Sequence, residues 1–133
     1  MIAIDTNIIV RVLTADDPTQ TKIAADLLRS NAVWISKTVL LETEWVLRHG
    51  YKLPETTINT AFQKLLRLPQ VHTEEPACIA LAIRWHAQGA DFADAVHLAS
   101  SGSCASLATF DKKLRNKAAE LTDSIPVYIP TTE

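Results

Sequence analysis

Helix-like stretches alternate along this chain with short runs rich in β-branched residues. The helical pattern predicts helices over residues 7–13, 18–29, 38–49, 54–66, 75–88, 92–101 and 111–118. The short runs predict strands over residues 2–5, 33–36, 70–73, 105–109 and 127–129. This alternation favours an α/β fold, in which a central parallel sheet of about five strands carries helices on both faces.

Several predicted helix ends have recognisable signals. Asp17 followed by Pro18 is typical of an N-cap and the first position of a helix. Gly50 and Gly89 suit helix ends, because glycine often follows the last turn of a helix. These signals support the predicted boundaries.

Length, composition and charge narrow the class of protein. A chain of 133 residues is expected to form a single domain, residues 1–133. An apolar fraction of 47% and a charged fraction of 21% are typical of a globular protein. The net charge of −2 gives no overall attraction for nucleic acid, which would have to meet local basic patches. We see no signal peptide and no membrane-spanning run, so we expect a cytoplasmic protein.

Acidic residues stand where predicted strands end and helices begin. Asp5 follows the first strand and Asp111 the fourth, while Asp91 and Asp94 open the helix between them. In an open α/β sheet, ligands bind at the carboxyl ends of the strands. Carboxylates brought together there repel one another unless a cation joins them, and oxygen ligands favour Mg²⁺ or Mn²⁺. Each of these aspartates also suits the start of a helix, so capping and metal binding both remain open.

Glu42 and Glu44 belong to the same predicted helix but differ in their neighbours. The helical period places Glu42 on one apolar face with Val39 and Trp45, where no local cation pairs with it. Because an unpaired buried carboxylate is costly, we interpret Glu42 as functional; a salt bridge to a distant basic residue is the alternative. Glu44 precedes Arg48 by four residues, the spacing of a surface ion pair, and we interpret it as structural.

The predicted helix after Asp111 is rich in basic residues. They are Lys112, Lys113, Arg115 and Lys117. Such a run is either a solvated helix face or a surface that holds phosphates beside the acidic residues. The acidic residues converge only if the strands that precede Asp5 and Asp111 are neighbours in the sheet.

Four segments in this order carry a family resemblance. They are IDTNIIVR (residues 4–11), LETEWVLR (41–48), DFADAVHLA (91–99) and TFD (109–111). Together they resemble the PIN-domain nucleases, and specifically the VapC-type toxins of toxin–antitoxin systems. The resemblance runs from Met1 to about Ala118 and implies a PIN-like three-layer α/β/α sandwich.

The resemblance also implies the site residues. The implied catalytic and metal-binding acids are Asp5, Glu42, Asp94 and Asp111. Asp91 would be an additional metal ligand or a neighbour of the ligands, and Asn7 and Thr109 would be polar supports beside the metal. The residues implied to contact RNA phosphates are Arg11, Lys112, Lys113 and Arg115.

The activity implied is that of a metal-dependent endoribonuclease. One or two Mg²⁺ or Mn²⁺ ions would activate a water molecule for in-line attack on an RNA phosphate, leaving a 5′-phosphate and a 3′-hydroxyl. A homodimer and a cognate antitoxin, bound in a groove near the first two helices, are implied as well. Several apolar residues of that region either line the groove or pack in the core: Ile8, Ile9, Val12, Leu13, Ala24, Leu27 and Leu28.

Other classes of protein also carry acidic residues near the ends of strands. The main alternative is a catalytically inert PIN-like module that binds RNA or protein, although all four implied acids are intact. A phospho-receiver domain would need an acidic pair after the first strand, and Asp16 and Asp17 lie too far past Asp5. A haloacid-type phosphatase would need a second aspartate where Asn7 stands.

Overall fold

The computed structural model describes residues 1–132, which fold into two compact units. The first unit is Met1–Pro76 and the second begins at Ala77. Both contain helices and parallel strands, so the expected α/β class is confirmed. The prediction of a single domain over residues 1–133 includes residue 133, which lies outside the described residues, and it stays a prediction.

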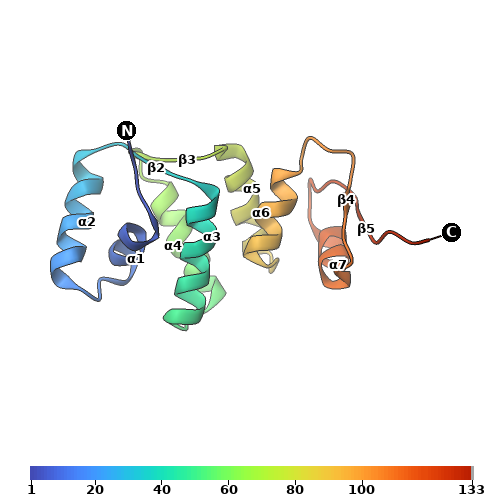
Figure 1. Cartoon of the computed structure of the whole chain (residues 1–133), viewed down its shortest axis with the longest axis horizontal. Coiled ribbons are helices and arrows are strands. Elements are labelled where there is room, and N and C mark those ends of the chain that lie inside the picture. Colours follow the sequence, from blue (N-terminus) through green and yellow to red (C-terminus); the bar gives the residue numbers. More distant parts are fainter. Residues whose placement is uncertain (133) are drawn as a thin grey trace. The chain divides into compact units, whose positions relative to one another are not determined.

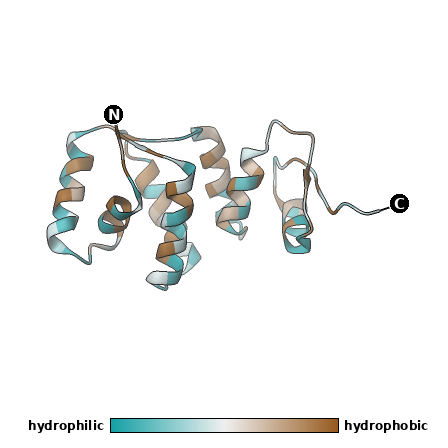
Figure 2. Cartoon of the chain, in the orientation of Figure 1, coloured by the Kyte–Doolittle hydropathy of each residue, from teal (hydrophilic) through white to brown (hydrophobic). Residues whose placement is uncertain are grey.

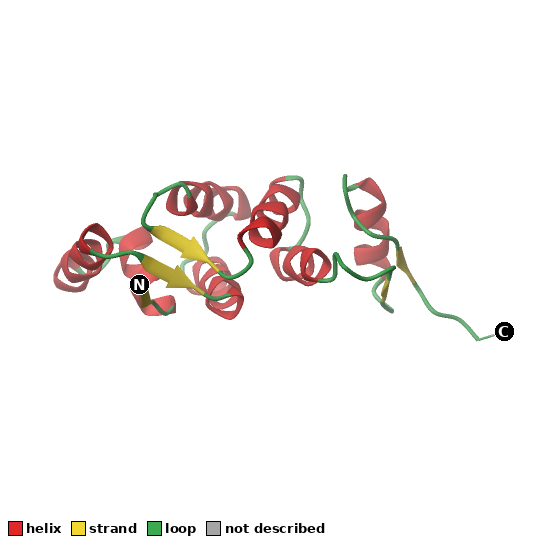
Figure 3. Cartoon of the chain, turned by 90° about the horizontal axis from the view of Figure 1, so that it is seen from above, coloured by secondary structure: helices red, strands yellow, loops and turns green. Residues whose placement is uncertain are grey.

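The first unit contains a three-stranded parallel sheet in the order β1-β2-β3. Its strands are β1 (Ile2–Ala3), β2 (Val33–Ile35) and β3 (Val71–Thr73). Ile2 lies opposite Val33, which in turn lies opposite Val71. The longer strands of this sheet are drawn as yellow arrows in Figure 3 and point the same way.

The helices of the first unit connect these strands (Figure 1). They are α1 (Thr6–Thr14), α2 (Pro18–Ser30), α3 (Lys37–Trp45), the π-helical turn η1 (Val46–Gly50) and α4 (Glu55–Leu66). Asp17 caps α2 and Pro18 is its first residue, as the sequence predicts. Brown and teal alternate along these helices in Figure 2, and their apolar residues Ile9, Leu40 and Phe62 are buried.

The second unit contains three helices and a two-stranded parallel sheet. The helices are α5 (Pro76–Ala87), α6 (Phe92–Ser100) and α7 (Lys112–Glu120). The strands β4 (Leu107–Ala108) and β5 (Val127–Tyr128) pair in parallel. Trp85, Phe92 and Leu98 are almost completely buried, and the indole of Trp85 donates a hydrogen bond to the carbonyl oxygen of Thr122 at 2.9 Å.

The predicted number of strands and helices is correct within residues 1–132, but the sheet is smaller than expected. The five strands form one sheet of three and one of two, rather than one central sheet. Each strand has only two or three residues, because its neighbours in the sequence enter loops or helix caps. None of the helices in residues 1–132 has the length and hydrophobicity needed to cross a lipid bilayer.

Candidate functional site

Three predicted acidic residues line one cavity in the second unit. Asp91, Asp94 and Asp111 share a cavity of about 480 Å³ between α6, α7 and the loop before α6. Lys113 and Lys117 of α7 line the same cavity. Residues separated by up to 26 positions in the sequence are thus brought together at one place, with both signs of charge.

The start of α6 fixes the first pair of acids. Asp91 is the N-cap, and its Oδ1 accepts a hydrogen bond from the backbone N–H of Asp94 at 3.0 Å. Asp91 is exposed, whereas Asp94 in the first turn is half-buried. The interpretation of Asp91 as a cap is therefore correct, and capping also places its carboxylate beside Asp94.

Asp111 occupies the equivalent position at the start of α7. Its Oδ1 accepts hydrogen bonds from the N–H groups of Lys113, at 2.9 Å, and Leu114, at 3.1 Å. The hydroxyl of Thr109 accepts a hydrogen bond from the backbone N–H of Asp111 at 3.0 Å. Thr109 therefore orients the backbone of Asp111, and its predicted role beside a metal stays a prediction.

The acids of the cavity affect one another's charge. Burial raises the pKa of the Asp94 carboxyl, and the negative charges of Asp91 and Asp111 raise it further, while His97 opposes the shift. A carboxylate with a raised pKa in a cluster of like charges is stabilised by a bound cation. The carboxylates of Asp91 and Asp111 therefore lie close enough to Asp94 to affect its protonation.

The other two predicted acids lie in the first unit, at the start of α1. Asp5 is exposed and caps α1, with its Oδ1 accepting from the N–H groups of Asn7 at 3.1 Å and Ile8 at 3.5 Å. Glu42 of α3 accepts a hydrogen bond from the hydroxyl of Thr6, the residue next to Asp5. The structure therefore brings Asp5 and Glu42 to the same end of α1.

The predicted environment of Glu42 is wrong. Glu42 is exposed and Trp45 is 57% exposed, so this face of α3 is not the buried one. The buried side carries Leu40, Thr43 and Glu44, because position 40 and positions three and four residues later share a helix face. The cost of an unpaired buried carboxylate therefore does not apply to Glu42.

Glu44 has the predicted partner but not the predicted exposure. Its Oε2 accepts a hydrogen bond from Nε of Arg48 at 2.6 Å, and its Oε1 accepts from Nη2 at 3.2 Å. The side chain of Glu44 is only 3% exposed, so the pair is not a surface ion pair. The bidentate contact with arginine is what allows a glutamate to occupy this buried face.

The donor chemistry of the predicted acids fits a hard divalent cation. Among residues 1–132, no three His, Cys, Asp or Glu side chains are grouped closely enough to hold a metal ion. In Asp5, Asp91 and Asp111, however, the helix N–H groups bond Oδ1, and within these residues Oδ2 takes no hydrogen bond. Each capping aspartate thus offers a second oxygen of the kind that Mg²⁺ and Mn²⁺ prefer.

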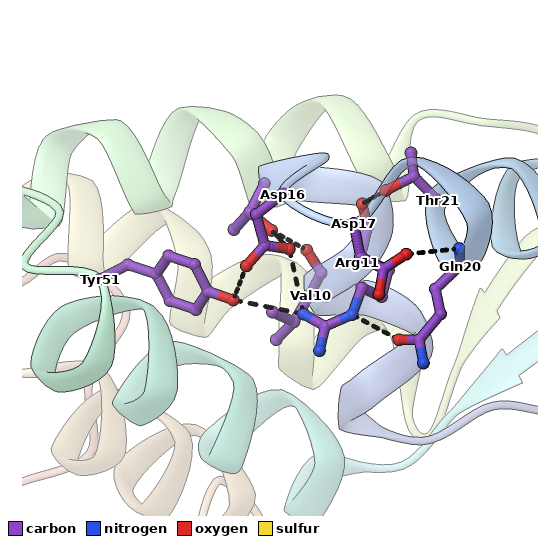
Figure 4. A network of polar contacts seen from close by, with 8 residues as sticks. Val10, Arg11, Asp16, Asp17, Gln20, Thr21 and Tyr51 are labelled. Atoms are coloured by element: carbon purple, nitrogen blue, oxygen red, sulfur yellow. Dashed lines mark hydrogen bonds and ion pairs between the residues drawn. The ribbon is translucent and has the colours of Figure 1, made fainter.

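The remaining predicted residues have different surroundings. Arg11 is bound within its own unit, with Nε donating to Gln20 at 2.6 Å and Nη1 donating to Asp16 at 3.1 Å and Tyr51 at 3.3 Å (Figure 4). Asn7 lines a small cavity of about 220 Å³ beside Arg11. The roles predicted for Asn7 and Arg11 stay predictions.

The three basic residues predicted on α7 also differ. Lys112 and Lys113 are exposed, and Lys113 lines the acidic cavity. The guanidinium of Arg115 donates to the side-chain oxygen of the neighbouring Asn116. Lys117, which the sequence shows only as part of a basic run, lines the cavity as well. The spacing of Lys113 and Lys117, four residues apart on one helix face, is the signal that distinguishes them.

Comparison with known proteins supports one family. No curated protein and no solved structure matches the chain significantly. The family model described as PIN domain matches residues 2–120, a range that includes all the predicted acidic residues. PIN domains are generally metal-dependent nucleases, which agrees with the oxygen donors found here. The chain belongs to the PIN domain family.

Proposed function

We propose that this protein is a metal-dependent endoribonuclease of the VapC type, a toxin that cleaves RNA and is neutralised by a cognate antitoxin. The observation that carries the proposal is the cavity in which Asp91, Asp94 and Asp111 meet Lys113 and Lys117. Carboxylates provide oxygen ligands for Mg²⁺ or Mn²⁺, and lysines provide positive charge for a phosphate. The family match supports a nuclease-type fold, and the RNA substrate is part of the proposal.

The proposed metal ligands are Asp5, Glu42, Asp94 and Asp111, with Asp91 as an additional ligand. They would bind one or two divalent ions. A bound ion of this kind activates water and neutralises charge on a phosphodiester. The expected products carry a 5′-phosphate and a 3′-hydroxyl.

Local hydrogen bonds hold the proposed metal ligands in place. At Asp5 and Asp111, helix N–H groups hold Oδ1 and so fix the direction of Oδ2. The Thr6 hydroxyl orients Glu42 in the same way. Fixed carboxylates lose little conformational freedom when they bind a cation or a substrate. Asn7 and Thr109 are proposed as the polar supports of this arrangement.

An apolar groove in the first unit supports the proposal that an antitoxin binds this protein. Val12 and Leu13 of α1 and Ala61 and Leu65 of α4 line a groove of about 630 Å³. Of the apolar residues predicted either to line a groove or to pack, Ile9, Ala24 and Leu28 are in the core. A groove between helices suits an amphipathic helix of a partner. A homodimer is proposed as well, and light scattering during size-exclusion chromatography would test it.

The experiment that tests the nuclease is RNA cleavage by the purified protein with Mn²⁺, with Mg²⁺ and with EDTA. We expect cleavage with either ion, none with EDTA, and loss of cleavage in Asp94→Asn. The end groups should be a 5′-phosphate and a 3′-hydroxyl. Metal binding should be measured alongside by calorimetry, because a protein that neither cleaves RNA nor binds metal would be the inert module instead.

Asp17 provides a matched control for the role of Asp5. Both aspartates cap a helix through a side-chain oxygen, but Asp17 caps α2 and is not a proposed ligand. Asparagine caps helices about as well as aspartate, so Asp5→Asn and Asp17→Asn should both keep the fold. Only Asp5→Asn should abolish cleavage. Wild-type rates in Asp5→Asn would remove this residue from the site.

A further inference from the structure

The cavity of the second unit contains a lysine whose ammonium group forms an ion pair with a residue outside the cavity. Nζ of Lys117 forms an ion pair with Oε2 of Glu120 at 3.3 Å. Within residues 1–132 it pairs with none of Asp91, Asp94 and Asp111, although all of them line the same cavity. Lys117 therefore forms no direct ion pair with the carboxylates of the cavity within the described residues.

The ion pair of Lys117 is easily exchanged for another. The side chain of Glu120 is 68% exposed, whereas that of Lys117 is only 32% exposed. An exposed pair at this distance contributes little to stability. A phosphate that enters the cavity can therefore replace Glu120 as the partner of Lys117 at small cost.

Because Gly89 has no side chain, the ammonium group of Lys117 can lie next to it. A Cβ atom at position 89 would lie 3.1 Å from Nζ of Lys117, closer than an ordinary contact. Gly89 also follows the last turn of α5 and has φ of +99°. Residues with a side chain disfavour this backbone conformation. The glycine thus has two roles, one in the turn and one as a gap next to the ammonium group.

We propose that Lys117 binds a phosphate of the RNA substrate in this cavity, and that Gly89 keeps the position of its ammonium group open. The inference rests on the proposed nuclease function. The ammonium group supplies a point charge for the phosphate, while the carboxylates of Asp94 and Asp111 face the same cavity. The apolar side chains of Leu98, Leu114 and Leu121 line the rest and suit a sugar or a base. At about 480 Å³, the cavity is in the size range of small-ligand sites.

Fluorescence anisotropy with a short fluorescein-labelled single-stranded RNA in Mg²⁺ tests this inference. All proteins carry Asp94→Asn, and a gel verifies that the RNA stays intact, so the readout is binding and not cleavage. Adding Lys117→Ala should weaken binding about five- to tenfold and reduce the slope of log affinity against log salt by about 0.7. Lys117→Arg should restore most of the affinity.

Lys22 is a matched control for Lys117. It forms an exposed ion pair with Asp26 in the first unit, at 2.9 Å. Lys22→Ala removes one positive charge and one ion pair without touching the cavity, so it should leave the affinity unchanged. Equal affinities for Lys117→Ala and Lys22→Ala would overturn the inference while leaving the nuclease proposal intact. No RNA binding by the Asp94→Asn protein together with no RNA cleavage by the wild type would contradict both.

Gly89→Ala tests whether the glycine acts through the lysine. Its backbone strain should lower the melting temperature whether or not Lys117 is present. Its effect on RNA binding should be several-fold with Lys117 and vanish with Lys117→Ala, because the same contact is already lost. An equal effect on affinity in both backgrounds would show that Gly89 acts through the turn alone.

Discussion

The hydroxyl of Thr6 donates a hydrogen bond to Oε1 of Glu42, across 36 positions of the sequence. Thr6 is buried at the first turn of α1, and Glu42 projects from the exposed side of α3. The bond connects the two helices and holds Glu42 beside the residue that follows Asp5. The proposed ligands of the first unit are therefore coupled through a threonine that is not itself a proposed ligand.

Thr6→Val should weaken both stability and activity. Valine has the shape of threonine but no hydroxyl, so the free energy of unfolding should fall by about 1 kcal/mol. RNA cleavage should fall about tenfold, because a group that orients a metal ligand has been removed. Denaturant titration and a cleavage assay measure the two effects. Thr6→Ser keeps the hydroxyl and should keep the activity; an equally inactive serine variant would show that the hydroxyl is not the cause.

Substitutions of Glu42 and Glu44 should have opposite effects. Glu44→Ala removes a buried partner of Arg48 and should lower the free energy of unfolding by about 2–3 kcal/mol. Glu42→Gln replaces an exposed side chain and should change stability by less than about 0.5 kcal/mol. At equal concentrations of folded protein, only Glu42→Gln should lose RNA cleavage. A fully active Glu42→Gln enzyme would remove Glu42 from the proposed site.

Asp94→Asn should stabilise the metal-free protein at neutral pH. Because the pKa of Asp94 is raised on folding, its contribution to stability is fully present below its ordinary value of 3.8 and is lost as the pH rises through the raised value. Asparagine resembles the protonated carboxyl at every pH. In EDTA, the melting temperature of the variant should therefore exceed that of the wild type at pH 7, and the difference should shrink below pH 3.8. A variant that melts below the wild type at pH 7 would contradict this assignment.

Tyr51→Phe should make the first unit less stable at neutral pH. Tyr51 donates a hydrogen bond to Oδ2 of Asp16 at 2.7 Å, and this bond is the largest cause that lowers the pKa of Asp16. A lowered pKa means that the stabilisation is present above 3.8 and is lost as the pH falls through the lowered value. The melting temperature should therefore fall at pH 7 and approach that of the wild type in acid.

Tyr128 supplies the control for Tyr51. Tyr128 is 49% exposed, and within residues 1–132 its hydroxyl takes part in no hydrogen bond, so Tyr128→Phe should leave the melting temperature unchanged. If Tyr51→Phe behaves like Tyr128→Phe at pH 7, the network of Figure 4 does not stabilise the fold.

The sequence was sufficient for the elements but not for some of their details. Every predicted helix and strand is present, because the pattern of each lies within a few consecutive residues. The helix predicted over 38–49 becomes π-helical at Val46, where the N–H of Tyr51 bonds the carbonyl oxygen of Val46. The periodicity of the side chains does not reveal that this hydrogen bond joins residues five apart, instead of the four of an ordinary α-helix. The outward orientation of Glu42 was also missed, since Glu44 is the acid that the buried face accommodates.

The sequence names the residues of the proposed site but not their arrangement. Asp91, Asp94 and Asp111 were identified as acids at helix starts, but their shared cavity depends on how α6 and α7 pack. Lys117 was one of four basic residues on α7, and its place in the cavity next to Gly89 becomes visible only in the structure. The competing roles of cap and ligand could not be separated either, because one carboxylate has an oxygen for each.

The proposed use of these carboxylates as both helix caps and metal ligands limits how such a protein can change over evolution. Replacing Asp5, Asp91 or Asp111 by alanine would remove a helix cap together with the charge, at a cost of about 1 kcal/mol for each position. Asparagine or serine would remove only the charge. A descendant that abandons catalysis but keeps its architecture would therefore retain small polar residues at these positions, and the loss of activity would leave the helix starts looking almost unchanged.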